Sequence, residues 1–146
     1  MDAAAHDEKA IRDLIESQAA QLSWSAQRAA NWLGFADGFA AGAPMIASAR
    51  PARLQSVAQF VERMKDLAGG SLRTFGERVL GGRILIFGNV AVALFAGETR
   101  ENETEINRDV SGYLLIKDQG RWRIAAQAWD KERPGHPIPK AMLEPG

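Results

Sequence analysis

Cysteine is absent from this chain of 146 residues, and histidine occurs only twice. Without cysteine the protein can form neither a disulfide nor a reactive thiolate. The two histidines, His6 and His136, lie near opposite ends of the chain, and neither has a second ligand at a spacing that zinc sites use. No phosphate-binding loop or dinucleotide fingerprint is present either. The sequence therefore predicts no metal site and no cofactor.

The chain also lacks an excess of charge and any long apolar run. Its 18 basic and 18 acidic residues cancel, whereas a nucleic-acid partner usually requires a basic face. The run at 90–96, VAVALFA, is far shorter than the ~20 residues that a membrane helix needs. The opening ten residues carry acids and no apolar stretch typical of a secretory signal. We expect a cytoplasmic protein without nucleic-acid or membrane partners.

The first half of the sequence has helical periodicity. Between residues 11 and 22 apolar side chains fall on one face of a helix of period 3.6, for which Asp7 is the expected N-cap. A second apolar face covers 29–36. A third runs from Leu54 to Leu67, with Pro51 in the first turn and two glycines as the stop. Three helices are therefore predicted in this half.

After residue 70 the periodicity becomes that of strands. RILIF and VAVALF flank Gly88-Asn89, a two-residue hairpin signal, and VSGYLLI and RWRIAAQAW flank a loop at 117–120. LRTFGERVL is a further strand, bent at Gly81-Gly82. Helices followed by a meander predict an α+β fold, with about three helices packed on a curved antiparallel sheet of four or more strands. We expect a single domain over 1–133 and a proline-rich arm over 134–146.

Three stretches resemble the NTF2-like superfamily, which has the cystatin-like fold. DEKAIRDLIESQAAQ resembles its first helix, WLGFADGFA the end of its second, and GYLLIKDQGRWRIAAQAWD its last hairpin. The superfamily includes ketosteroid isomerase, scytalone dehydratase and SnoaL-like cyclases. The resemblance implies a cone-shaped α+β domain with a pocket inside.

The resemblance does not extend to the catalytic residues of the isomerase. In that branch a carboxylate base stands six residues beyond the Asp of the Phe-Ala-Asp run, and this position is Ala43 here. Ser111 occupies the place of the second acid, and a serine cannot act as a neutral carboxylic acid. A dehydratase-type dyad would need a histidine on the strands or the third helix, where there is none. Asp37 and Asp109 remain as candidate bases; the expected alternatives are a helix-end surface residue for Asp37 and a cross-strand ion-pair partner for Asp109.

The resemblance also implies which side chains face the pocket: Gln18, Phe95, Ser111, Tyr113, Gln127 and Trp129. They would form an apolar pocket with a few polar groups, suited to a small and largely apolar organic ligand. The leading hypothesis is a binding protein without catalysis. The alternatives are an isomerase, dehydratase or cyclase that uses Asp109 or Asp37 as base, and an assembly module whose cone is filled.

Strict alternation along the last two strands predicts an apolar outer face. It would present Leu114, Ile116, Trp122 and Ile124. A patch of this size on a monomer usually marks an interface, so the sequence predicts a homodimer through the outer face of the sheet.

Overall fold

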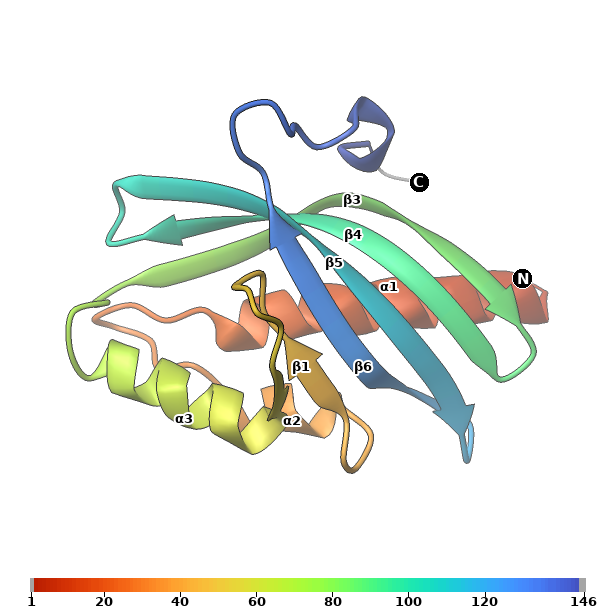
Figure 1. Cartoon of the computed structure of the whole chain (residues 1–146). Coiled ribbons are helices and arrows are strands. Elements are labelled where there is room, and N and C mark those ends of the chain that lie inside the picture. The colour runs from red at the N-terminus through yellow and green to blue at the C-terminus, as the bar shows by residue number, and fades with distance from the viewer. Residues whose placement is uncertain (1, 145–146) are drawn as a thin grey trace.

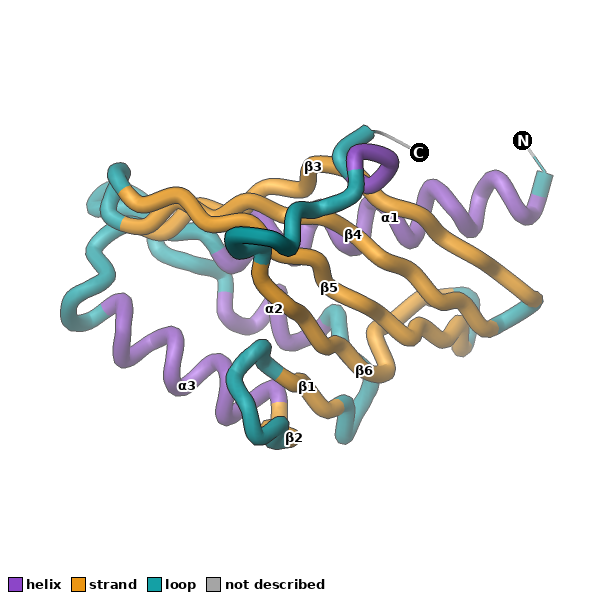
Figure 2. Tube along the Cα trace, turned by 45° about the horizontal axis from the view of Figure 1, so that its top comes forward, coloured by secondary structure: helices purple, strands orange, loops and turns teal. Residues whose placement is uncertain are grey.

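The computed structural model describes residues 2–144 of the chain. Met1, which the predictions assign to the domain, and Pro145 and Gly146, which they assign to the arm, lie outside the described residues. Helices lie on one side of a curved sheet, and the segment after the last strand lies against the opposite side (Figures 1 and 2). The predicted α+β arrangement is thus confirmed.

From residue 2 onward, three α-helices precede the long strands: α1 (Ala3–Leu22), α2 (Trp32–Asp37) and α3 (Val57–Ala68). Helix α1 begins earlier than predicted, because the Asp2 side chain accepts the backbone N–H of Ala5. Helix α3 begins later than predicted, because Ser56 and Gln59 form a capping box. The expected cap role of Asp7 and the expected helical turn at Pro51 are therefore wrong. No helix in residues 2–144 is both long and apolar enough to cross a membrane.

Within the described part of the chain, the sheet has six strands in the order β2-β1-β6-β5-β4-β3. Its strands are β1 (Pro44–Ile46), β2 (Leu54–Ser56), β3 (Phe75–Phe87), β4 (Val90–Glu101), β5 (Glu105–Asp118) and β6 (Arg121–Lys131). The four long strands form the predicted antiparallel meander. Strand β1 pairs in parallel with β6, so the sheet is mixed rather than purely antiparallel.

Two β-bulges change which side chains face the helices. The register of β3 shifts between Val79 and Gly81, within the predicted bend. In β6 the register shifts at Ala125, which no residue of β5 opposes. Each extra residue reverses the alternation of the side chains beyond it.

The β6 bulge makes the predicted outer face wrong at two positions. Trp122 and Ile124 are buried, with exposures of 5% and 0%. The Trp122 Nε1–H donates to Asp7 of α1 at 2.9 Å, so this side chain faces the helices. Leu114 is exposed, as predicted, because β5 keeps its alternation. The outer apolar surface is instead supplied largely by β3 and β4.

The segment after β6 returns along the sheet. Residues 140–142 form a short 3₁₀ turn, η1 (Lys140–Met142). The carbonyl oxygen of Glu144 packs so tightly on Gly81 that a Cβ there would lie only 2.4 Å away. Ile138 is buried, and its N–H donates to the Glu132 carboxylate at 2.9 Å. The proline-rich segment therefore packs against the sheet as far as residue 144.

Candidate functional site

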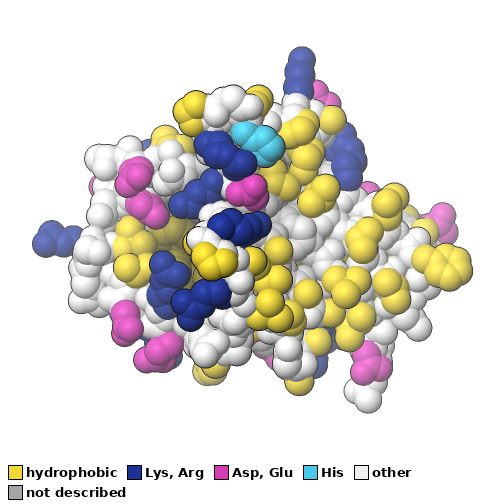
Figure 3. All heavy atoms as spheres, viewed as in Figure 1, with side chains coloured by type: hydrophobic (Ala, Val, Ile, Leu, Met, Phe, Trp, Pro, Cys, Tyr) yellow, Lys and Arg dark blue, Asp and Glu magenta, His cyan; other side chains and the backbone are white. Residues whose placement is uncertain are grey.

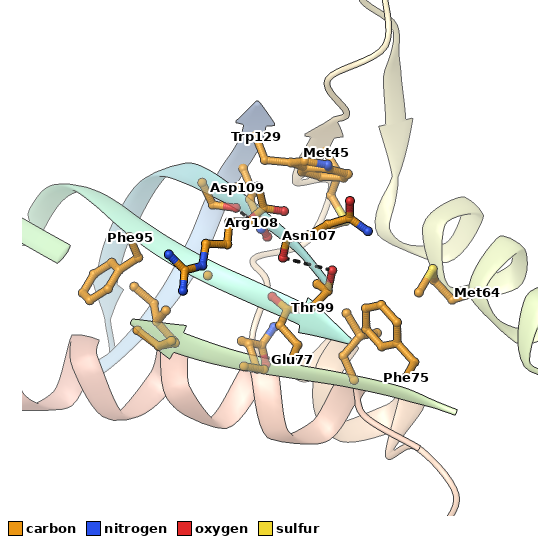
Figure 4. A pocket seen from close by; sticks show the side chains of 18 of the residues that line it. Met45, Met64, Phe75, Glu77, Phe95, Thr99, Asn107, Arg108, Asp109 and Trp129 are labelled. Atoms are coloured by element: carbon orange, nitrogen blue, oxygen red, sulfur yellow. Dashed lines mark hydrogen bonds between the residues drawn. The ribbon is translucent and has the colours of Figure 1, made fainter. Parts of the chain in front are cut away.

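A cavity of about 210 Å³ lies between the helices and the concave face of the sheet. In the view of Figure 4, Phe95 lies at one side of it and Phe75 and Met64 at the other. Its wall is formed by α1, α2, α3 and all four long strands, together with Met45 of β1. The volume is below the ~300 Å³ at which pockets for drug-sized ligands begin, so the cavity suits a small molecule.

Helices α2 and α3 supply an aromatic wall. The rings of Phe35 and Phe60 are stacked with centroids 5.7 Å apart, and Phe60 meets the edge of Trp129 at 5.9 Å. Aromatic pairs in such arrangements stabilise by about 0.5–1.5 kcal/mol beyond their buried area. This wall fixes Trp129 against the cavity.

All six side chains predicted to line the pocket are in the cavity wall. The Gln127 amide donates to the Ser111 hydroxyl at 3.2 Å and to the Tyr113 hydroxyl at 3.4 Å. Burial raises the pKa of Tyr113, and the nearby Glu77 adds to this effect. The Gln18 amide donates to the carbonyl of Phe35 at 2.9 Å. The polar part of the wall is thus an ordered set of hydrogen-bonding groups.

Asp109 also faces this cavity, from strand β5. Its neighbour on β4 is Gly97, where a Cβ would lie 3.4 Å from Oδ1 of Asp109, so the glycine leaves room for the carboxyl group. Burial raises the pKa of Asp109 to about 6, while the positive charge of Lys131, its partner on β6, acts in the opposite direction. The expected ion pair with an arginine is absent: among residues 2–144 no basic group lies within 4.0 Å of this carboxyl group.

Glu77, on strand β3, is a second carboxyl group in the cavity wall. Burial, and secondarily the charge of Asp109, raises the pKa of Glu77 to about 8. Its position is set by the end of α1, because its backbone N–H donates to the Ser23 hydroxyl at 3.0 Å. Figure 4 shows Glu77 and Asp109 on different strands of the cavity wall.

The two carboxyl groups differ in protonation at neutral pH. With a pKa of about 6, Asp109 is mainly a carboxylate at pH 7, whereas Glu77, at about 8, is mainly a carboxylic acid. Two titratable groups whose surroundings separate their pKa values in this way are typical of an acid and a base that work together. The cavity therefore contains a proton acceptor and a proton donor.

Sequence reasoning missed Glu77, although its strand was predicted. The signal was available in the alternation of LRTFGERVL, where Phe75, Glu77 and Val79 share one face. An acid between two inward apolar residues of a strand is a candidate buried carboxyl group. The wall residues Met45, Met64 and Phe60 were also missed, since they depend on how β1 and α3 pack.

Asp37 lies outside the cavity. Its side chain is 61% exposed and forms an ion pair with Arg121 at 2.5 Å. The hydrogen bond from this guanidinium group lowers the pKa of Asp37, so the carboxylate is a weaker base than usual. Ala43 is buried beside Pro44 but does not line the cavity. Within residues 2–144 no three His, Asp or Glu side chains gather as a metal site would require.

No protein-family model matches this chain, and no curated protein matches it. Solved structures do match this chain. A protein from Novosphingobium aromaticivorans with the provisional name scytalone dehydratase superposes with a TM-score of 0.72 at 10% identity, over 88% of this chain and 86% of that one. An NTF2-like protein of unknown function from Pseudomonas putida has a TM-score of 0.68 at 13% identity, over 100% of this chain and 96% of that one.

A protein of unknown function from Mycobacterium tuberculosis gives a TM-score of 0.71 at 17% identity, over 88% of this chain and 73% of that one. At such low identity these matches concern the fold. They confirm that the chain has the NTF2-like, cystatin-like fold that the three sequence stretches indicated.

Proposed function

Starting from an NTF2-like fold whose cone holds two carboxyl groups, we propose that this protein is an acid–base enzyme for a small, largely apolar organic substrate. The observation that carries the proposal is the pairing of Asp109 and Glu77 in one apolar cavity, with pKa values of about 6 and about 8. General acids and bases work best when their pKa values lie near the working pH. The sequence favoured a protein without catalysis because the isomerase acids are missing at Ala43 and Ser111. Two other carboxyl groups, those of Glu77 and Asp109, line this cavity and support catalysis.

The reaction class follows from the protonation states. The Asp109 carboxylate removes a proton from a carbon next to a carbonyl group, and the Glu77 carboxylic acid donates its proton to the oxygen that becomes negative. Return of the proton to another carbon gives an isomerisation; loss of a neighbouring hydroxyl group as water gives a dehydration. The provisional name of the Novosphingobium protein agrees with this class. The neutral Tyr113 hydroxyl is a further hydrogen-bond donor for the oxygen.

A model ketone tests the proposal without knowledge of the natural substrate. The protein should accelerate exchange of the α-protons of 2-tetralone, a two-ring ketone, with deuterium in D₂O, as followed by NMR. Asp109→Asn should remove the acceleration, and the rate should rise with pH near 6 and fall near 8. Asp37→Asn, which removes a surface carboxylate, is the matched control and should exchange like the parent protein.

Two other results would contradict the proposal. Equal exchange by the Asp109→Asn variant would exclude Asp109 as the base. Binding of the ketone without any acceleration would leave a ligand-binding protein, the hypothesis that the sequence favoured.

We also propose that two copies associate through the outer face of the sheet. Six large apolar side chains of this face are at least 42% exposed: Leu85, Phe87, Val90, Val92, Leu94 and Leu114. Four of them, Leu85, Val92, Leu94 and Leu114, border an apolar depression of about 570 Å³. Figure 3 shows hydrophobic side chains spread over this part of the molecule. An exposed apolar face of this kind can pack against the same face of a second copy of the chain. Light scattering should give the mass of a dimer for the parent protein and of a monomer for Leu94→Asp; a monomeric parent would exclude the interface.

The remaining sequence-based expectations stay predictions. They are the division into a domain over 1–133 and an arm over 134–146, the cytoplasmic location, and the absence of a nucleic-acid partner.

A further inference from the structure

A second groove, of about 390 Å³, lies between α3 and the connection from β1 to β2. Among residues 2–144, its charged lining consists of Arg53 and Arg63, without an aspartate or glutamate. Neither guanidinium group has an acidic partner within 4.0 Å or a hydrogen-bond acceptor among residues 2–144. Two arginines in one groove without a counter-charge form a positive site that a ligand can neutralise.

The groove begins where the catalytic cavity ends. Phe60 and Met64 of α3 line the cavity, and Gln59 and Arg63, one residue before each, line the groove. On the other wall Met45 lines the cavity and Ala47 lines the groove. Two residues of extended chain span only about 6.6 Å. The two sites are thus neighbours along both α3 and the β1 segment.

The strand register places the groove at the end of the cavity that Lys131 lines. Strands β1 and β6 run in parallel, with Met45 beside Gln127 and Ile46 beside Ala128. The chain beyond Ile46 therefore continues in the same direction as β6 does toward Lys131. Figure 3 shows Lys and Arg side chains gathered around a hollow in this region. A ligand that extends out of the cavity at this end meets positive charge.

We propose that the substrate of this enzyme is an amphipathic anion, whose apolar part occupies the cavity and whose carboxylate or phosphate group binds to Arg53 and Arg63. Guanidinium groups match both oxyanions through paired N–H donors. Helix α3 also begins at this groove, and its N-terminal dipole adds a partial positive charge. The inference rests on the proposed function, since it assumes that the cavity binds the reacting part of the ligand.

Three probes with one alkyl chain test the inference: octanoate, its neutral amide octanamide, and octyl phosphate. Titration calorimetry on the whole protein should show both anions binding about tenfold more tightly than the amide. Raising the salt concentration should weaken the binding of the anions alone. The double variant Arg53→Gln/Arg63→Gln should lose the preference for anions and still bind octanamide like the parent. Lys65→Gln removes a positive charge from α3 outside the groove and should keep the preference.

The outcomes separate the two proposals. Octanamide that binds as tightly as the anions, or a preference for anions that survives in the double variant, would overturn the anion site and leave the cavity as a ligand site. Failure of all three probes and of 2-tetralone to bind would overturn the proposed function itself. The anion that binds more tightly indicates whether the natural substrate is a carboxylic acid or a phosphate ester.

Discussion

Replacing Glu77 with glutamine should stabilise the protein in a way that depends on pH. Below about pH 4.5 the Glu77 carboxyl group is protonated in both the folded and the unfolded chain, and above about pH 8 it is ionised in both. Between these values the folded state holds a proton that the unfolded state has lost. Stability contributed by a group of this kind is complete at low pH and is lost as the pH rises.

The size of the effect follows from the same two values. Each pH unit between 4.5 and about 8 removes about 1.4 kcal/mol from the free energy of unfolding, which amounts to about 5 kcal/mol in a dry cavity. Water that enters the cavity screens the charge and reduces the cost. We therefore expect Glu77→Gln to raise the free energy of unfolding by about 2–4 kcal/mol at pH 9 and to leave it unchanged at pH 4.

Urea denaturation at a series of pH values measures this difference directly. The parent protein should become less stable from pH 5 to pH 8, and the variant should lose most of that slope. Glu62→Gln, on the exposed surface of α3, is the matched control and should preserve the slope. A Glu77→Gln variant that is no more stable than the parent at pH 9 would refute the conclusion that this carboxyl group is buried and protonated.

Four further substitutions test the packing. Asp7→Asn should lower the melting temperature above pH 4 and have less effect below it, because hydrogen bonds from Trp122 and from a lysine lower the pKa of Asp7 in the folded state. Phe35→Ala should cost about 3–5 kcal/mol in urea denaturation, since it removes a buried ring from the aromatic wall. Ile124→Asp should abolish folding, as judged by circular dichroism, whereas Leu114→Asp should fold; the opposite result would mean that β6 has no bulge at Ala125.

Much of the fold could be predicted because its signals are local. The hairpin at Gly88-Asn89 and the strand that bends at Gly81 are encoded in a few adjacent residues. The short strands β1 and β2 could not be predicted with the same certainty. They are three residues each. Strand β1 depends on pairing with β6, more than 80 positions away in the sequence, and β2 in turn pairs only with β1. Helix α3 begins later than predicted for a related reason, because Leu54 and Gln55 belong to strand β2.

The residues of the candidate site could likewise be predicted only in part. The six side chains that the family resemblance implied for the pocket line the cavity, and each lies on a long strand or on α1, where periodicity fixes the inward face. Glu77 was not predicted because the resemblance indicates acids only at the positions where the isomerase has them. Its raised pKa depends on burial beneath α1 and on the charge of Asp109, which lies 32 positions later in the chain. Only the folded structure brings these groups to one cavity.

The bulge in β6 explains both the wrong prediction and the shape of the site. Without it, Gln127 and Trp122 would face opposite sides of the sheet, and one end of the cone would lack its packing. With Ala125 unpaired, Trp122 and Ile124 turn inward and close that end against α1, while Trp129 and Lys131 line the other. A fully alternating strand would therefore leave either the closed end or the cavity without its side chains. The single extra residue allows one strand to form packed core at one end and to line the cavity at the other.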